Sequence, residues 1–199
     1  MGLRQASLSD ILSSGQYHSA LICTYSIDPV FTKTILIPLL QSNRVRNTTI
    51  LSDRRELRRA LQGEEILSIL QGTSFLLLPA KTKQLFHPKV MLFAGEKTGL
   101  CVIGSGNLTH SGMGGNNEVW GAYHFSPENQ QNAGVFRDVW EFLQSYNPSI
   151  SGVGREKSRE WILNHSQWLS DIVSGQAAIE EAPIEIFVNK EKPILGQLS

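Results

Sequence analysis

Short apolar runs alternate with amphipathic stretches along most of the chain. Runs rich in β-forming residues predict strands at 19–26, 48–51, 75–78, 90–93, 99–103 and 119–125. Stretches with apolar positions three or four residues apart predict helices at 30–41, 54–62, 129–144 and 157–173. This alternation, with one hairpin at 95–97, predicts an α/β fold, in which a mixed β-sheet is flanked by helices as an α/β sandwich.

Polar residues and prolines give the boundaries of these elements. Asp28-Pro29 is expected to cap the helix that follows it, and Ser52 or Asp53 is expected to cap the helix at 54–62. In the helix at 157–173, Trp161 and Trp168 lie seven residues apart and are expected to face the core.

The chain is expected to form one main domain over residues 1–178, with a C-terminal extension over 179–199. The extension contains an apolar run at 184–188 that predicts a further strand. Two interpretations remain open: this strand joins the main sheet, or it begins a second domain that is cut short.

Composition excludes several classes of protein. Of the 199 residues 41% are hydrophobic and 18% are charged, which favours a folded core over disorder. No apolar run approaches the roughly 18 residues that a membrane span needs, and the N-terminus lacks the pattern of a signal peptide. Cys23 and Cys101 lie in apolar runs and are expected to be buried thiols in a reducing compartment, so a cytoplasmic location is predicted.

Charge is distributed unevenly although the formal net charge is zero. Residues 30–97 hold eleven Lys or Arg against five Asp or Glu, whereas residues 98–199 hold six against eleven. The arginines within residues 30–97 are clustered in the sequence. Such a cluster is a candidate phosphate-binding face, and the other interpretation is a helix surface that is simply exposed to solvent. The candidate nucleic-acid-binding residues are Arg44, Arg46, Arg54, Arg55, Arg58 and Arg59.

Chemically reactive side chains concentrate between positions 87 and 118. His87 and Lys89 lead into a strand and fall on the same side of it, while Ser105 and Asn107 occupy a glycine-flanked turn after the next strand. Glu118 directly precedes the strand after that. An imidazole can act as nucleophile or acid, a lysine can bind phosphate oxygens, and a carboxylate on the far imidazole nitrogen can fix its tautomer. Taken singly, each has a plainer interpretation as a loop histidine, a surface lysine or a hairpin turn.

The combined pattern resembles the HKD signature of the phospholipase D superfamily. His87-x-Lys89, Gly104-Ser105-x-Asn107 and Glu118 match it in residue type, and their spacing is most similar to the nuclease branch, including the metal-independent restriction endonuclease of that superfamily. The full signature has an Asp where this chain has Ala94, so Glu96 is either its replacement or a hairpin-tip charge.

The resemblance implies a mechanism and an assembly. In the family one histidine attacks phosphorus to form a phosphohistidine, and a second one protonates the leaving oxygen; neither a metal nor another cofactor takes part. This chain has a single His-x-Lys, because His18, His110, His124 and His165 are not followed by Lys two residues later. One active site would therefore need a homodimer, or the missing half of a two-repeat enzyme.

The expected function is metal-independent hydrolysis of nucleic acid, with DNA favoured, and with no membrane partner. The resemblance also implies a place in a restriction or DNA-processing system, with a helicase or DNA-recognition module fused or separate. Two alternatives remain open: a phospholipid or small-phosphodiester hydrolase, and a non-catalytic nucleic-acid-binding module with a degenerate site. DNA or RNA preference, strandedness and cleavage specificity are not encoded in any recognisable motif.

Overall fold

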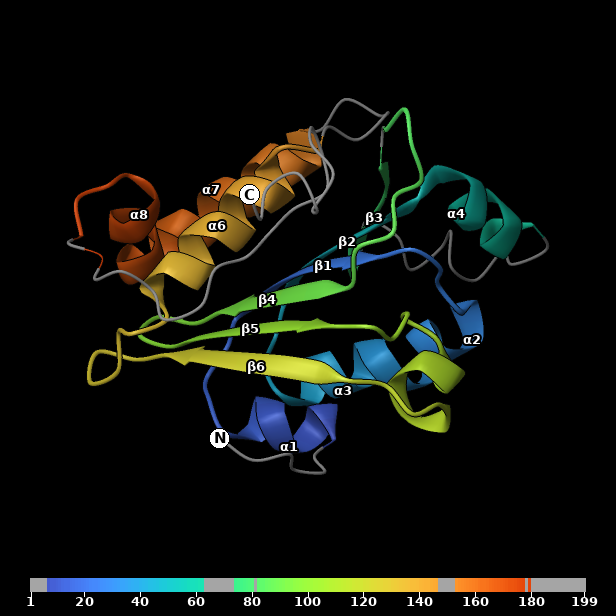
Figure 1. Cartoon of the computed structure of the whole chain (residues 1–199), viewed down its shortest axis with the longest axis horizontal. Helices are drawn as coiled ribbons and strands as arrows, with labels where there is room; N and C mark the ends of the chain where they lie inside the picture. Colours follow the sequence, from blue (N-terminus) through green and yellow to red (C-terminus); the bar gives the residue numbers. More distant parts are fainter. Residues whose placement is uncertain (1–6, 63–73, 81, 147–152, 178, 180–199) are drawn as a thin grey trace, which may run out of the picture.

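In the computed structural model of the protein, a six-stranded mixed sheet forms the centre of the molecule (Figure 1). The structure describes residues 7–62, 74–80, 82–146, 153–177 and 179. The strand order is β3-β2-β1-β4-β5-β6; β1, β2 and β3 are parallel, and β4, β5 and β6 join antiparallel. The strands are β1 (Ser19–Thr24), β2 (Asn47–Asp53), β3 (Leu76–Ala80), β4 (Val90–Ala94), β5 (Gly99–Gly104) and β6 (Trp120–Phe125).

Helices cover both faces of this sheet (Figure 1). One face packs against α1 (Leu8–Ser13), α2 (Pro29–Phe31), the π-helix η1 (Thr32–Leu36), α3 (Ile37–Ser42) and α4 (Arg54–Leu61). The other packs against α6 (Ala133–Gln144), α7 (Val153–His165) and α8 (Gln167–Val173). Alternate residues of β1 divide between the two apolar clusters, with Ile22 in one and Cys23 in the other, as the strand period of two requires. The expected mixed sheet flanked by helices is confirmed.

Two of the expected helices are interrupted. The stretch at 30–41 forms α2, η1 and α3 in succession, with Pro38 near the start of α3, where a missing N–H is tolerated. The stretch at 157–173 belongs to α7 and α8, which meet at Ser166. The expected core position of Trp161 is wrong, since 39% of this residue is exposed. Trp168 instead stacks on Phe125 at 4.2 Å.

The expectations for the C-terminus lie mostly outside the described residues. The strand expected at 184–188 and nearly all of the extension over 179–199 fall in this part of the chain. None of the described helices combines the length and the apolar character that a membrane crossing requires.

The two cysteines are buried free thiols in the apolar cluster under α6, α7 and α8. Burial raises the pKa of both Cys23 and Cys101 far above the ordinary value, so neither thiol is a nucleophile at neutral pH.

Candidate active site

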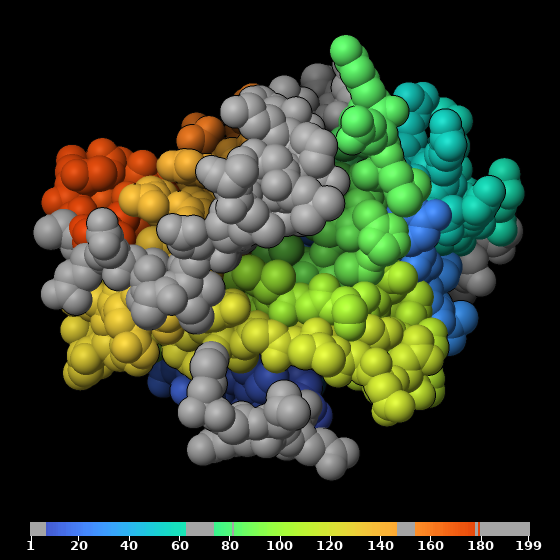
Figure 2. All heavy atoms as spheres, in the orientation of Figure 1, coloured from blue at the N-terminus to red at the C-terminus, as the bar shows by residue number. Residues whose placement is uncertain are grey.

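Strand register brings the candidate residues to one edge of the sheet. The pairing of Cys23 with Val90, Val90 with Ile103 and Gly104 with Trp120 aligns the ends of β1, β4, β5 and β6. The segments 82–89 and 105–119 therefore meet at this edge, where the Gly104 N–H donates to the carbonyl oxygen of Lys89 at 3.1 Å. Both segments reach the surface of the molecule, as the green and yellow-green spheres of Figure 2 show.

His87 and Lys89 are in direct contact at this edge. The Lys89 Nζ atom lies 2.7 Å from His87 Nδ1 and 3.1 Å from Nε2, and it donates to the His87 carbonyl oxygen at 3.1 Å. His87 is exposed, whereas Lys89 is only 7% exposed. An ammonium group has donors alone, so it can bond to the ring only when the imidazole is neutral and offers a lone pair.

Electrostatics favour the same protonation state of His87. Partial burial is the largest cause that holds the pKa of His87 below its usual value, and the positive charge of Lys89 is the second. The backbone carbonyl group of His87 and the charge of Asp53 oppose this shift. Burial also lowers the pKa of Lys89, and the Glu118 carboxylate partly compensates. The site thus places a neutral imidazole beside a partly desolvated cation, the arrangement of a nucleophile next to an anion-binding group.

Ser105 and Glu118 form the second pair. The Ser105 hydroxyl donates to Glu118 Oε2 at 2.5 Å and accepts the Val119 N–H at 3.2 Å, and the Asn116 side-chain amide donates to Glu118 Oε1 at 3.3 Å. In the described chain no hydrogen bond joins Glu118 to the His87 ring. The expected carboxylate–imidazole bond is therefore not formed within one chain; Glu118 acts on Lys89 through its charge.

Asn107 is held by close backbone packing. A Cβ at Gly106 would lie 2.1 Å from the Gly112 carbonyl oxygen, and one at Gly112 would lie 2.4 Å from the Asn107 carbonyl oxygen, so both positions require glycine. Gly112 belongs to the π-helix η2 (Ser111–Gly115). Asn107 Oδ1 is buried and has no hydrogen-bond partner among the described residues. Unpaired polar atoms of this kind are uncommon and concentrate at functional sites.

The residues at the departure from the HKD signature lie elsewhere. Ala94 ends β4 and pairs with Ser19, at the opposite end of the five-residue strand from His87. Glu96 follows in the hairpin, where its charge acts on His18. Position 94, where the full signature has Asp, thus lies about 15 Å from His87 along β4 at about 3.3 Å per residue.

The structure divides the candidate arginines into two groups. Arg54, Arg55, Arg58 and Arg59 are exposed on α4, which starts at the edge that carries His87. Arg44 and Arg46 precede β2, so the strand separates them from α4 by about 20 Å at about 3.3 Å per residue. The single arginine face expected from the sequence is thus not formed. Arg59 is paired with Glu56 at 2.6 Å, and the other three on α4 have no ion pair in the described chain.

Two residues at this edge were not predicted as part of the site. The Tyr25 ring lies 4.7 Å from the His87 ring between centroids, and Lys89 Nζ lies 5.8 Å from the Tyr25 centroid. Asp53 accepts the N–H of Phe86 at 3.2 Å. Their positions in the sequence could have indicated this. Tyr25 follows the buried strand β1, and Asp53 ends β2. These two strands are parallel, so their carboxyl ends lie at the same edge of the sheet.

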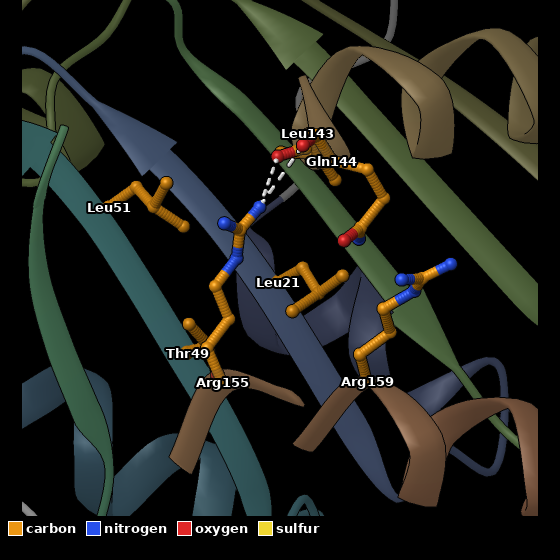
Figure 3. A pocket seen from close by; sticks show the side chains of 7 residues that line it. All are labelled: Leu21, Thr49, Leu51, Leu143, Gln144, Arg155 and Arg159. Carbon is orange, nitrogen blue, oxygen red and sulfur yellow. Dashed lines mark hydrogen bonds between the residues drawn. The ribbon is translucent and has the colours of Figure 1, made fainter. Parts of the chain in front are cut away.

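A small pocket lies away from this edge, between the sheet and the helices α6 and α7 (Figure 3). Its most polar feature is Arg155, whose guanidinium donates to the carbonyl oxygens of Leu143 and Gln144 at 3.2 and 3.3 Å and so caps the end of α6. This role is structural. Within the described ranges no three His, Cys, Asp or Glu side chains gather as metal ligands.

Similarity to known proteins is found among solved structures. No family model and no curated protein matches the chain. Among solved structures it is similar to Nuc from Salmonella typhimurium, a phospholipase D family member, with 19% identity and a TM-score of 0.47 over 72% of this chain and 88% of that chain. NucT from Helicobacter pylori gives 17% identity and a TM-score of 0.47 over 71% and 87%. Similarity of this size does not assign an activity, so the function rests on the residues of the site.

Proposed function

We propose that this protein is a phosphodiesterase that hydrolyses nucleic acid without a metal ion. The observation that carries the proposal is the contact of the His87 ring with the Lys89 ammonium group at 2.7 Å, on a surface edge shared with Ser105, Asn107 and Glu118. A neutral imidazole beside a buried cation suits attack on a phosphorus atom, because the cation stabilises the negative charge that grows on the phosphate oxygens.

The reaction proceeds in two displacements. His87 attacks phosphorus, a nitrogen–phosphorus bond forms, and the bond to the leaving oxygen breaks while a second imidazole gives that oxygen its proton. The second imidazole then takes a proton from water, the oxygen of which attacks phosphorus and breaks the nitrogen–phosphorus bond. Lys89 neutralises the phosphate oxygens in both steps, and Ser105 and Asn107 supply donors around them.

The second imidazole is His87 of another copy of the chain. The sequence has one His-x-Lys, so a site with two of them requires two chains or a second repeat. Two exposed apolar residues flank the site: Leu85, two residues before His87, is 58% exposed, and Val119, next to Glu118, is 71% exposed. In this proposal the second copy covers these two side chains.

Nucleic acid is the proposed substrate class because of α4. Arg54, Arg55 and Arg58 extend a cationic surface from the edge that holds the site, and a polymer with regularly spaced phosphates can contact both together. DNA is the favoured polymer, in a restriction or other DNA-processing system in which a helicase or recognition module supplies the sequence specificity.

The test is cleavage of end-labelled single- and double-stranded DNA and RNA in excess EDTA. We expect the wild-type protein to cleave nucleic acid, and His87→Ala to lose at least about 1000-fold in rate, since removal of the covalent nucleophile leaves only binding contributions. The matched control is His124→Ala, which removes an exposed histidine from the other end of β6.

Three results would contradict the proposal. An absolute requirement for added magnesium would exclude the metal-free mechanism. Hydrolysis of a phospholipid or a small diester, with no action on DNA or RNA, would exclude the substrate class. Salt-sensitive DNA binding that is the same in wild type and His87→Ala, with no cleavage by either, would identify a binding module.

A further inference from the structure

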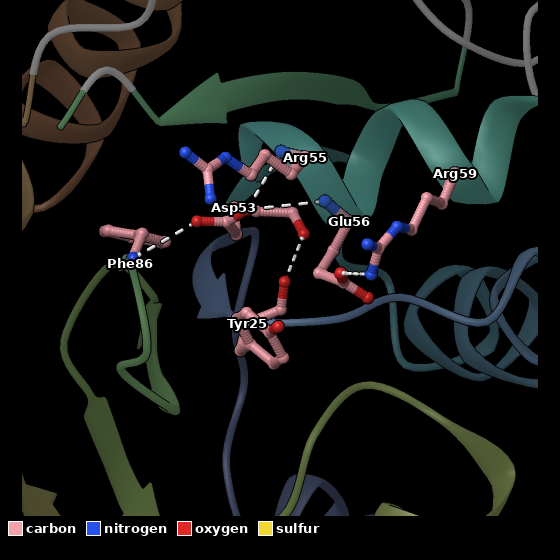
Figure 4. A network of polar contacts seen from close by, with 7 residues as sticks. Tyr25, Asp53, Arg55, Glu56, Arg59 and Phe86 are labelled. Carbon is pink, nitrogen blue, oxygen red and sulfur yellow. Dashed lines mark hydrogen bonds and ion pairs between the residues drawn. The ribbon is translucent and has the colours of Figure 1, made fainter. Parts of the chain in front are cut away.

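Asp53 connects the start of α4 with the segment before His87 through one buried carboxylate (Figure 4). It ends β2, is only 6% exposed, and is the N-cap of α4. Its Oδ1 atom accepts the N–H groups of Arg55 at 2.8 Å and Glu56 at 3.3 Å, while Oδ2 accepts the N–H of Phe86 at 3.2 Å. A cap needs only one oxygen, so the second one is left to hold the residue that precedes His87.

Phe86 transmits this contact to the site. Its ring is 1% exposed and packs in the cluster under α6, with the Tyr146 ring 4.9 Å away between centroids. The side chain is therefore fixed by the core and the N–H by Asp53. His87 follows directly in a stretch that has no regular secondary structure before β4, so its backbone position depends on such contacts.

Tyr25 links the same aspartate to the imidazole from the other side. The carbonyl oxygen of Tyr25 accepts the N–H of Asp53 at 3.3 Å and the hydroxyl of Ser52 at 3.0 Å. The Tyr25 ring in turn lies against the His87 ring. Asp53 thus fixes, through its side chain and its backbone, both the segment that carries the imidazole and the ring that packs on it.

The charged groups around His87 come from three segments at this edge. Burial and then the charge of Lys89, which directly precedes β4, lower the pKa of His87, and Asp53 at the end of β2 opposes this shift. Glu118, two residues before β6, acts through its charge on Lys89. Asp53 is therefore the carboxylate that supports an imidazolium at His87 within one chain, in the place that sequence reasoning gave to Glu118.

We propose that Asp53 is a positioning residue for His87: it fixes the backbone before the imidazole and opposes the charge of Lys89. The proposal rests on the role of His87 as nucleophile. A carboxylate at this place gives the ring a defined orientation, and it stabilises the positive charge that the imidazole acquires as it attacks phosphorus. Asp53 itself touches no reacting atom.

Asp53→Asn separates this role from the helix cap. Asn is as good an N-cap as Asp, so α4 keeps its cap, but the amide nitrogen then faces the Phe86 N–H and the negative charge is gone. Asp53→Ser, which also retains a cap and loses the second acceptor, serves as the second variant. The matched control is Asp28→Asn, because Asp28 caps α2 through the Phe31 N–H at 3.0 Å and does not act on the charge of His87.

The measurements are the NMR titration of the His87 ring and the kinetics of cleavage. We expect the pKa of His87 to fall in Asp53→Asn, since the charge that favours its protonated form is lost, and the acid limb of the kcat profile to move to lower pH. We expect kcat to fall by about 10- to 100-fold with KM within about threefold, as for a displaced catalytic group. Asp28→Asn should change neither.

A His87 titration that is identical in wild type, Asp53→Asn and Asp53→Ser would overturn the proposal, whatever the rate. The titration needs no substrate, so this result differs from a failure of the proposed function, in which the wild-type protein itself would not cleave nucleic acid.

Discussion

Lys89 brings a charged group into a site where only 7% of the residue is exposed. Desolvation opposes the charged form, and the neighbours of the ammonium group are an imidazole, a carbonyl oxygen and the Tyr25 ring. Such an environment is costly for a lysine whose only purpose is structural. The cost is understandable if the cation binds the phosphate of a substrate, because desolvation strengthens that interaction.

Lys89→Met should therefore separate stability from activity. We expect the free energy of unfolding to stay the same or rise by up to about 1 kcal/mol, because a buried cation is replaced by an apolar side chain of similar length. Cleavage should be lost. Urea unfolding and the cleavage assay check the two parts, with Lys97→Met in the exposed hairpin as control. A large loss of stability in Lys89→Met would mean that the lysine is mainly structural.

At the scale of the elements, strand ends and one tight turn hold the residues of the site in place. The turn that carries Ser105 and Asn107 can approach η2 only because neither Gly106 nor Gly112 has a Cβ. We expect Gly106→Ala to lower kcat by about tenfold or more, because the new Cβ would displace the turn or Trp120, and small displacements of catalytic groups have large effects on rate.

The matched control for this substitution lies in the same region. Gly114→Ala, also in η2, adds a Cβ that meets nothing within 4 Å, and it should leave kcat unchanged. Equal activity of Gly106→Ala and the wild-type protein would show that the geometry of this turn does not matter to the reaction.

Helix α4 gives a second prediction at this scale. Replacing Arg54, Arg55 and Arg58 by Ala should weaken DNA binding and reduce the dependence of log K on log salt by about 0.7–0.9 for each phosphate that the helix no longer neutralises. The Arg44→Ala, Arg46→Ala double variant removes charge from the other end of β2 and should have little effect. Equal losses of affinity from both sets, measured by fluorescence anisotropy at several salt concentrations, would mean that the positive charge acts without a defined surface.

The limits of sequence reasoning are visible in particular elements. Local signals located every strand of the sheet, because hydrophobic period and turn chemistry are local, and they narrowed the cap of α4 to Ser52 or Asp53, of which Asp53 is the cap. They ended this strand at residue 78, before Pro79, yet β3 continues to Ala80; as an edge strand, β3 tolerates a residue without an N–H. They also missed the break at Ser166 between α7 and α8.

At the site, too, the sequence indicated what is local and missed contacts between distant residues. The spacing of His87, Lys89, Ser105, Asn107 and Glu118 identified residues that the fold gathers at one edge. The contact between Asp53 and Phe86 spans 33 positions, and no local pattern reports it. The partner of Glu118 was misjudged for the same reason, since a hydrogen bond between two loop side chains depends on the packing of both loops.

At the scale of the whole molecule, the proposal requires two copies of the chain. Mixing wild type with a ninefold excess of His87→Ala, under conditions that let chains exchange, should reduce the activity to about one tenth, because nearly every wild-type chain then has an inactive partner. The same excess of His124→Ala, which is itself active, should instead raise the activity about tenfold, in proportion to the total protein. Activity that stays proportional to the wild-type chain, together with a monomeric mass in sedimentation at assay concentration, would contradict the shared site.

The most direct test of the central claim is to look for the covalent intermediate. Wild-type protein is mixed in EDTA with DNA labelled in its phosphates, denatured within milliseconds to seconds, digested, and analysed by mass spectrometry. We expect a phosphate-linked DNA fragment on the His87 imidazole, formed and lost at rates that match turnover, and no adduct in His87→Ala. Turnover without an adduct at His87, or an adduct on any other residue, would contradict the account.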